Sequence, residues 1–251
     1  MGALHEGHAS LIRAARQQCE AVAVSIFVNP TQFGPNEDFS RYPRTFEADC
    51  KLAETEGADV IFAPNVEEIY PQGAATFVEV EGLSNRLDGA SRPGHFRGVT
   101  TVVSKLFLAA EPDRAYFGQK DAAQVAVLRR MTTDLRFRTE IVVCPIVRDP
   151  DGLALSSRNI YLSPEERQQA LTLSRAIRRV ESLFTNGVRD SAVLISAARE
   201  IFTAEPAVRI DYIELVDWST LLPIDFATPG TLFAVAAYLG TTRLIDNTIL
   251  Q

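Results

Sequence analysis

The sequence has few of the residues from which disulfide frameworks and zinc sites are built. It contains three cysteines and three histidines in 251 residues. An odd number of widely spaced cysteines is typical of free thiols in a reducing cytoplasm, and neither a cysteine knuckle nor an H-E-x-x-H pattern is present. The N-terminal segment MGALHEGHASL also lacks the cationic start and apolar core of a signal peptide. We therefore expect a cytoplasmic protein.

Concentrated positive charge and long apolar runs are also lacking. Lys and Arg number 25 against 32 Asp and Glu, a formal net charge of -7, with no basic block. Nucleic acids and anionic membranes bind concentrated cationic faces, so neither is an expected partner. The longest uncharged stretch, 226–242, is interrupted by Pro229 and two glycines and is too short to span a bilayer. A small-molecule ligand is the favoured partner.

Strand and helix patterns alternate in the first part of the chain. Apolar runs typical of buried parallel strands alternate with amphipathic helices. This order predicts an α/β fold with an open, doubly wound parallel sheet, which binds ligands at the carboxyl ends of its strands. The expected strands are 21–28, 59–63, 114–117 and 140–147, and the expected helices are 9–19, 46–56, 102–108 and 125–135.

The pattern changes near residue 148. Ser163, Pro164 and Glu166 are typical of a helix start, and Asn186-Gly187 is typical of its end. A second helix at 192–204 and strands at 209–217, 231–239 and 243–250 predict a small antiparallel sheet covered by two helices. We predict two domains, 1–147 and 148–251, the second a smaller α+β domain that can act as a lid.

One element of the doubly wound pattern is lacking. The first predicted helix follows a Gly/His-rich turn, and in such folds a strand leads into this turn. Because Met1 already lies in the turn, we expect a missing central strand beside 21–28. The unpaired backbone groups would then make the chain prone to aggregate or to borrow a strand from a partner.

Two histidines lie in the turn His5-Glu6-Gly7-His8, directly before the first predicted helix. Unpaired N–H groups and the positive dipole end of a helix attract phosphate, and imidazoles can donate to charge growing on a phosphoryl group. The alternative is a helix-capping turn with surface histidines, the commoner outcome for an isolated H-x-x-H pattern.

Three further polar clusters suit the same ligand. Lys120 and Arg158 suit the oxygens of a polyphosphate. The side-chain amides of Gln124, Asn29 and Gln32 suit hydroxyls and carboxylates instead. Each has a structural alternative: a helix cap at Asp121, a capping loop with an ion pair, and an Asn-Pro turn. Their common place at the predicted strand ends favours one site. The clusters are Gly118-Gln119-Lys120-Asp121 with Gln124 one turn later, Leu155-Ser156-Ser157-Arg158-Asn159, and Asn29-Pro30-Thr31-Gln32-Phe33.

The segments MGALHEGH, FVNPTQFGPNEDFSRYPRT, RPGHFRGVTTVVSKLF, YFGQKDAAQ and DGLALSSRNIYLS resemble the pantoate:beta-alanine ligase family, in order and over nearly the whole chain. The resemblance places the chain among HIGH-type nucleotidyltransferases and implies a Rossmann-like ATP domain, a C-terminal lid and a homodimer. It also implies an AMP-forming acid–amino-acid ligase. The pantoate carboxylate attacks the α-phosphorus of ATP, releasing pyrophosphate with Mg²⁺, and the amine of beta-alanine then displaces AMP from pantoyl adenylate.

The resemblance also implies roles for single residues. His8 matches the proton donor and His5 its phosphate-contacting neighbour, and we add Lys120 and Arg158 as catalytic residues. The residues assigned to pantoate are Gln32, which also lies near the beta-alanine site, Gln124 and, from its residue type, Asn29. Further ATP contacts are Met1, Gly2, Ala3, Leu4, Glu6, Gly7, Gly118, Gln119, Asp121, Val147, Leu155, Ser156 and Ser157. Family members commonly have Met at Leu155, a mild change in an apolar side chain.

Two other functions stay open on the sequence. One is an adenylyltransferase for another small acceptor, which the pair Gln32 and Gln124 argues against. The other is an inactive nucleotide-binding or interaction protein that arose by truncation of an enzyme. Release of AMP with each substrate omitted in turn separates these functions.

Overall fold

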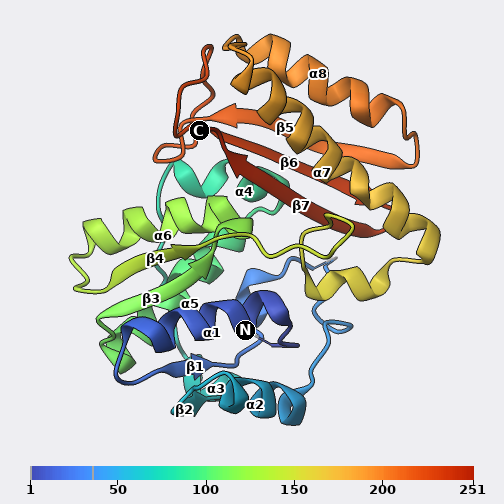
Figure 1. Cartoon of the computed structure of the whole chain (residues 1–251). Helices are drawn as coiled ribbons and strands as arrows, with labels where there is room; N and C mark the ends of the chain where they lie inside the picture. Colours follow the sequence, from blue (N-terminus) through green and yellow to red (C-terminus); the bar gives the residue numbers. More distant parts are fainter. Residues whose placement is uncertain (1, 36) are drawn as a thin grey trace. The chain divides into compact units, whose positions relative to one another are not determined.

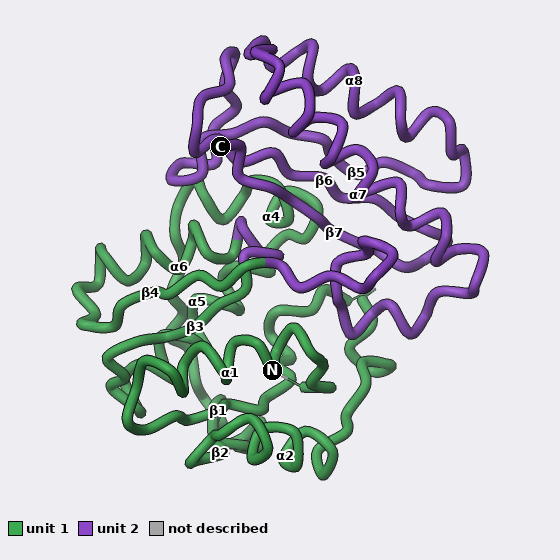
Figure 2. The backbone as a smooth tube through the Cα atoms, viewed as in Figure 1, with its two compact units in different colours: residues 1–118, 124–145 green, residues 119–123, 146–251 purple. Residues whose placement is uncertain are grey.

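The computed structural model describes residues 2–35 and 37–251 (Figure 1). The chain folds into two compact units (Figure 2). The first unit is Met1–Gly118 with Gln124–Pro145, and the second is Gln119–Ala123 with Ile146–Gln251. The chain therefore passes between units close to residue 146, and also at both ends of a short segment, Gln119–Ala123, that sequence patterns do not set apart. None of the helices in the described residues has the length and apolar character needed to cross a membrane.

The parallel strands of the first unit form two pairs. Strand β1 (Ala23–Ser25) pairs with β2 (Val60–Phe62), and β3 (Arg114–Gly118) pairs with β4 (Glu140–Cys144). Longer helices alternate with these strands along the chain, as predicted: α1 (Glu6–Gln18), α2 (Phe46–Thr55), α5 (His95–Ala110) and α6 (Ala122–Asp134). The short helical elements are η1 (Pro30–Gln32), α3 (Val66–Ile69), η2 (Leu83–Asn85), α4 (Asp88–Ser91) and η3 (Gln119–Asp121).

The expected sheet is present as two halves. In the described residues, β1 and β3 are each paired along one edge only, so the parallel strands do not form one continuous ladder. Side chains connect the halves instead. Tyr116 of β3 packs against the apolar cluster that contains Ile12 of α1, and its hydroxyl lies 3.4 Å from Cys19 Sγ.

The strands are shorter and less buried than their apolar runs predict. The run 140–147 ends as a strand at Cys144 because Pro145 has no N–H to continue the ladder. The expectation of fully buried strands is wrong for β2, where Val60 and Phe62 are 56% and 42% exposed. Ile61 between them packs against the apolar cluster of α1 and β1, whereas Val60 and Phe62 alternate to the opposite face of the strand, which is left uncovered.

Helices α1, α5 and α6 begin earlier than predicted, and the first turns of α1 and α5 show why. Helix α1 begins at Glu6 because the His5 side chain caps it. Helix α5 begins at His95, seven residues before its predicted apolar face, directly after Gly94 in the left-handed conformation (φ +82°). The first turn of each of these two helices contains His, Glu or Arg, so apolar periodicity alone does not reveal it.

The second unit has the predicted α+β arrangement. Strands β5 (Val208–Val216), β6 (Leu232–Leu239) and β7 (Thr242–Ile249) form an antiparallel sheet in that order. Helix α7 (Pro164–Thr185) packs on β6 and β7, and α8 (Ser191–Thr203) packs on β5. The predicted capping box of α7 is present, with the Ser163 hydroxyl accepting the Glu166 N–H at 3.1 Å. The remaining short element is η4 (Ser157–Tyr161).

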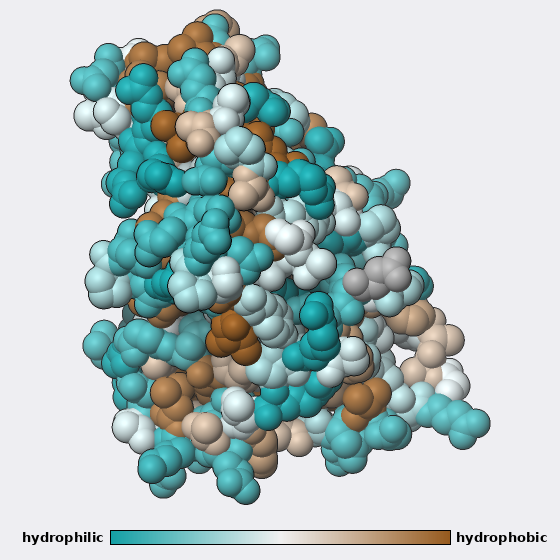
Figure 3. Space-filling view, turned by 90° about the vertical axis from the view of Figure 1, so that its right-hand side faces the viewer, coloured by the Kyte–Doolittle hydropathy of each residue, from teal (hydrophilic) through white to brown (hydrophobic). Residues whose placement is uncertain are grey.

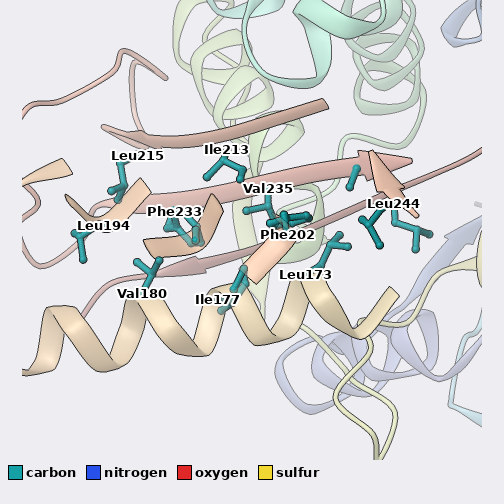
Figure 4. Packing of buried hydrophobic residues seen from close by; sticks show 14 of the residues in the cluster. Leu173, Ile177, Val180, Leu194, Phe202, Ile213, Leu215, Phe233, Val235 and Leu244 are labelled. Atoms are coloured by element: carbon teal, nitrogen blue, oxygen red, sulfur yellow. The ribbon is translucent and has the colours of Figure 1, made fainter. Parts of the chain in front are cut away.

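The core of the second unit lies between α7, α8 and the sheet. Leu173, Ile177 and Val180 of α7 point toward Phe233 and Val235 of β6 (Figure 4). Burial of such side chains stabilises a fold by roughly 1.5–3 kcal/mol each. Hydrophobic residues on the face shown in Figure 3 form small groups separated by hydrophilic ones. On this face, the hydrophobic side chains therefore do not gather into one large patch.

Candidate active site

The two histidines of the first turn cap α1. Nδ1 of His5 accepts the Gly7 N–H at 3.1 Å, and Nδ1 of His8 accepts the His5 N–H at 3.3 Å. The ring centroids are 4.1 Å apart. A ring nitrogen that accepts a hydrogen bond carries no proton, so each neutral imidazole has its proton on Nε2. The capping alternative is therefore realised, and it fixes the tautomer in which Nε2–H is the donor.

The backbone of the same turn is bound inside the chain. The carboxylate of Asp49, in the first part of α2, accepts the N–H groups of Ala3 and Leu4 at 2.9 and 2.8 Å. Together with the two imidazole caps, these bonds occupy four N–H groups of the turn. The expectation of unpaired helix N–H groups facing a phosphate is therefore wrong for Gly7. The N–H groups of Ala3, Leu4 and His5, which precede the helix, are occupied as well.

Three other residues of the turn were predicted as ATP contacts. Gly2 is buried, and a Cβ there would lie 3.0 Å from a methyl group of Val28. Glu6 forms an ion pair with Arg13 of its own helix. Met1 lies outside the described residues.

Asn29 is a buried residue that organises the loop after β1. Its Oδ1 accepts the Thr31 N–H and the Tyr70 hydroxyl, at 3.3 and 2.8 Å. Its Nδ2 donates to Gly98 O at 3.1 Å and to Gln32 Oε1 at 3.3 Å. The Asn-Pro turn alternative is thus realised, with the Asn29 amide holding the loop and the Gln32 side chain.

The main chain of Gln32 is held from the start of α5. The Gln32 carbonyl accepts hydrogen bonds from His95 Nδ1 at 2.8 Å and from Arg92 Nη2 at 3.3 Å. Burial and the neighbouring Arg92 charge lower the pKa of His95 to about 4, so the ring is neutral near pH 7. Burial raises the pKa of Glu37, but the hydrogen bonds and the positive charge of Arg92, together with smaller contributions, leave the pKa lowered.

In the second unit, a buried asparagine holds the segment with Lys120. Asn247 of β7 is 3% exposed, and its Nδ2 donates to the carbonyls of Gln119 and Lys120 at 3.0 and 2.9 Å. Its Oδ1 accepts the Gln119 amide at 3.2 Å. Trp218 Nε1 also donates to Ala122 O at 3.0 Å. These bonds explain why Gln119–Ala123 belongs to the second unit, apart from Gly118 and Gln124.

The predicted contacts Val147 and Leu155 are joined by a hydrogen bond from Leu155 N to Val147 O, of 3.0 Å. Arg148 fastens this chain reversal to β7 through two bonds to the buried Asp246, at 2.6 and 2.8 Å. Ser156 then caps η4, its hydroxyl accepting the Arg158 N–H at 3.3 Å. The predicted ATP segments of the second unit are therefore bound to β7, one by Asn247 and one by Asp246.

Sequence reasoning missed the residues that hold these loops: Asp49, Arg92, Arg148, Asp246 and Asn247. A signal was present for two of them. Asp49 lies one helical turn before Ala53 on the predicted apolar face of α2, and Asn247 lies within an apolar strand. A polar group at a buried position needs a hydrogen-bonding partner, but the pattern does not reveal which one.

No group of three or more His, Cys, Asp or Glu side chains in the described residues is arranged to hold a metal ion.

The protein-family model for pantoate-beta-alanine ligase matches residues 1–249 of the chain. The chain belongs to this family. The predicted family is therefore confirmed, and the chain is a ligase.

Curated relatives of the ligase agree with this assignment. A pantothenate synthetase of Acidobacterium capsulatum is 64% identical over 250 residues, which cover 100% of this chain and 84% of that protein. One of Koribacter versatilis is 60% identical over 251 residues, which cover 100% of this chain and 86% of that protein.

Solved structures confirm the fold of the ligase. The crystal structure of pantothenate synthetase from Thermus thermophilus matches with a TM-score of 0.97 and 49% identity, over 99% of this chain and 90% of that chain. Pantoate-beta-alanine ligase from Francisella tularensis, complexed with beta-gamma ATP and beta-alanine, matches with a TM-score of 0.80 and 35% identity, over 99% and 87%. The α/β fold class with a Rossmann-like domain and a C-terminal domain is therefore confirmed.

Proposed function

We propose that this ligase joins pantoate to beta-alanine in two steps. A pantoate carboxylate oxygen attacks the α-phosphorus of ATP, and the bond from that phosphorus to pyrophosphate breaks. The beta-alanine amine then attacks the acyl carbon of pantoyl adenylate, loses a proton, and AMP leaves with the phosphate oxygen. Membership of the ligase family over residues 1–249 carries this proposal, and the Francisella relative with beta-gamma ATP and beta-alanine supports it.

The catalytic residues we propose are His5, His8, Lys120 and Arg158. The Nε2–H tautomer of the capping imidazoles supports a role as donors to the charge that grows on the leaving pyrophosphate. Lys120 and Arg158 neutralise the phosphate oxygens. The ATP contacts predicted from the sequence keep their proposed role, except that the amides of Ala3, Leu4, His5 and Gly7 are occupied.

Pantoate is assigned to Gln32 and Gln124, with Asn29 holding the Gln32 amide. We propose that Mg²⁺ is bound mainly through oxygens of ATP, because Mg²⁺ keeps several waters and favours phosphate oxygens. We also propose a cytoplasmic homodimer in which residues 148–251 act as a lid over an ATP domain of residues 1–147. Three free cysteines support the cytoplasmic location.

Isotope exchange tests the first step. Pantoate without beta-alanine should support exchange of labelled pyrophosphate into ATP, because the adenylate forms before the amine is needed. Other small carboxylic acids offered in place of pantoate are the controls. Exchange that requires beta-alanine would contradict the two-step order, and equal exchange with the other acids would favour an adenylyltransferase of broader specificity.

A further inference from the structure

We propose that Asp49 is a positioning residue, whose buried carboxylate holds the turn of residues 2–8 in the conformation that presents His5 and His8. The inference rests on the proposed function, since it assumes that these imidazoles act on ATP. Asp49 itself lies behind the turn and contacts its backbone. Its role is therefore distinct from that of a catalytic residue.

The Asp49 carboxylate is buried, and its hydrogen-bond donors belong to the turn and to Thr45. Asp49 is 2% exposed. It accepts the Ala3 N–H at Oδ2, and the Leu4 N–H and the Thr45 hydroxyl at Oδ1, at 2.9, 2.8 and 2.9 Å. A buried carboxylate is costly unless it is hydrogen-bonded, so these donors are bound strongly to it. The first turn of α2 adds the positive end of the helix dipole.

The backbone of the turn has a conformation that needs such support. Ala3 has a φ of +48°, a left-handed value that residues with a side chain seldom adopt. Consecutive N–H groups around a left-handed residue form a concave nest that binds an anion. Here the nest of Ala3 and Leu4 contains the Asp49 carboxylate, so the anion that stabilises the turn belongs to the chain itself.

Ala3 and Leu4, which Asp49 holds, directly precede His5 in the chain. Leu4 packs against the apolar cluster of α1 and β1, and His5 is the N-cap of α1. The carboxylate, the left-handed residue and the imidazole cap are therefore consecutive parts of one hydrogen-bonded unit. Loss of the carboxylate should free Ala3 to leave the left-handed region and should misplace both rings.

A double-mutant cycle with His8 distinguishes positioning from a purely structural role. Asp49→Asn retains the shape, but one acceptor oxygen becomes an NH₂ group that cannot accept a backbone N–H. We expect the pantoate-dependent exchange rate, per mole of folded protein, to fall about tenfold or more, because small misplacements of reacting groups are expensive. In a His8→Ala background the same change should cost about threefold or less, since one of the two rings it positions is gone and only His5 can still be misplaced.

Asp59→Asn is the control for loss of a carboxylate that binds backbone at an exposed position. Asp59 also accepts a backbone N–H, from Val22 at 2.7 Å, but lies outside the turn. We expect its exchange rate to stay within about twofold of the parent. An Asp49→Asn loss of the same size in both His8 backgrounds, or a loss no larger than that of Asp59→Asn, would overturn the proposal. A parent chain without pantoate-dependent exchange contradicts the proposed function instead.

Thr45→Val covers the case in which Asp49→Asn does not fold. It removes one donor from Oδ1 and leaves the carboxylate and its bonds to Ala3 and Leu4. The exchange rate should fall by about two- to fivefold in the parent, and the effect should again be smaller in the His8→Ala background. An equal effect in both backgrounds would show that Thr45 and Asp49 contribute stability alone.

Discussion

The turn before α1 and the segment before α6 are held by opposite hydrogen-bonding chemistry. In the first unit, the Asp49 carboxylate accepts two backbone N–H groups; in the second, the Asn247 amide donates to two backbone carbonyls. A carboxylate can only accept, and an amide can donate twice. Each buried side chain therefore supplies the acceptors or donors that complement the backbone groups it contacts. Short loops that bear candidate catalytic residues are thus fixed by side chains distant in sequence.

The largest expected effect separates the capping role of His8 from its proposed chemical role. His8→Ala should lower the rate of adenylate formation by ~10²-fold or more, typical of losing a transition-state donor or general acid, with a smaller effect on ATP binding. His8→Asn is the control, because its amide oxygen can still accept the His5 N–H. If His8→Asn keeps the parental rate, His8 is only a cap.

Replacing the Asn247 amide, which holds Gln119 and Lys120, with a carboxylate should have the next largest effect. Asn247→Asp replaces the donor of two hydrogen bonds by a buried carboxylate that faces two carbonyls. We expect the free energy of unfolding to fall by about 2–4 kcal/mol, as for a buried group left without a partner, and the exchange rate to fall with it. Urea unfolding measures the first quantity. A loss below about 1 kcal/mol would show that β7 does not hold Gln119 and Lys120 in this way.

The neutral imidazole of His95 holds a third loop, that of Gln32. The free energy of unfolding should therefore depend on pH. His95 has a pKa of about 4 in the folded chain, below the ordinary 6.5, so protonation favours the unfolded chain. This contribution is present above pH 6.5 and is lost as the pH falls toward 4. We expect about 2 kcal/mol less stability at pH 5 than at pH 8. His95→Gln should remove most of this difference in urea unfolding; an unchanged difference would assign it to other groups.

The smallest expected effect concerns the neutral amides assigned to pantoate. Gln124→Ala should raise the KM for pantoate by about tenfold and change the KM for ATP much less, because an amide suits hydroxyls better than phosphate charge. Steady-state kinetics with each substrate varied gives both constants. Equal changes would contradict the pocket assignment. The same change at Gln32 should also affect the step with beta-alanine.

The order of the elements could be predicted from the sequence, but the contacts that fix the loops could not. Apolar periodicity gave β5, β6 and β7 to within one or two residues, since each strand has a buried face. It missed the start of α5 because His95 and Arg97 precede the apolar stripe. It also led us to expect buried parallel strands, whereas Val60 and Phe62 of β2 are exposed.

The candidate site, like the fold, could be predicted from the sequence only in part. The chemical character of His5, His8, Lys120 and Arg158 follows from residue type and from position before a helix. The bonds of Asp49 to Ala3 and Leu4 join residues 45 or more positions apart, and those of Asn247 join residues more than 120 positions apart. Such pairings depend on the packing of whole elements, which local patterns do not encode.

The most direct test of the proposed reaction is a single-turnover measurement with one substrate withheld. With the enzyme in excess over ATP, pantoate alone should release pyrophosphate while AMP remains bound as pantoyl adenylate. Addition of beta-alanine should then release AMP together with pantothenate in equal amounts. Pyrophosphate release without pantoate, or free AMP formed at the full rate before beta-alanine is added, would contradict the account.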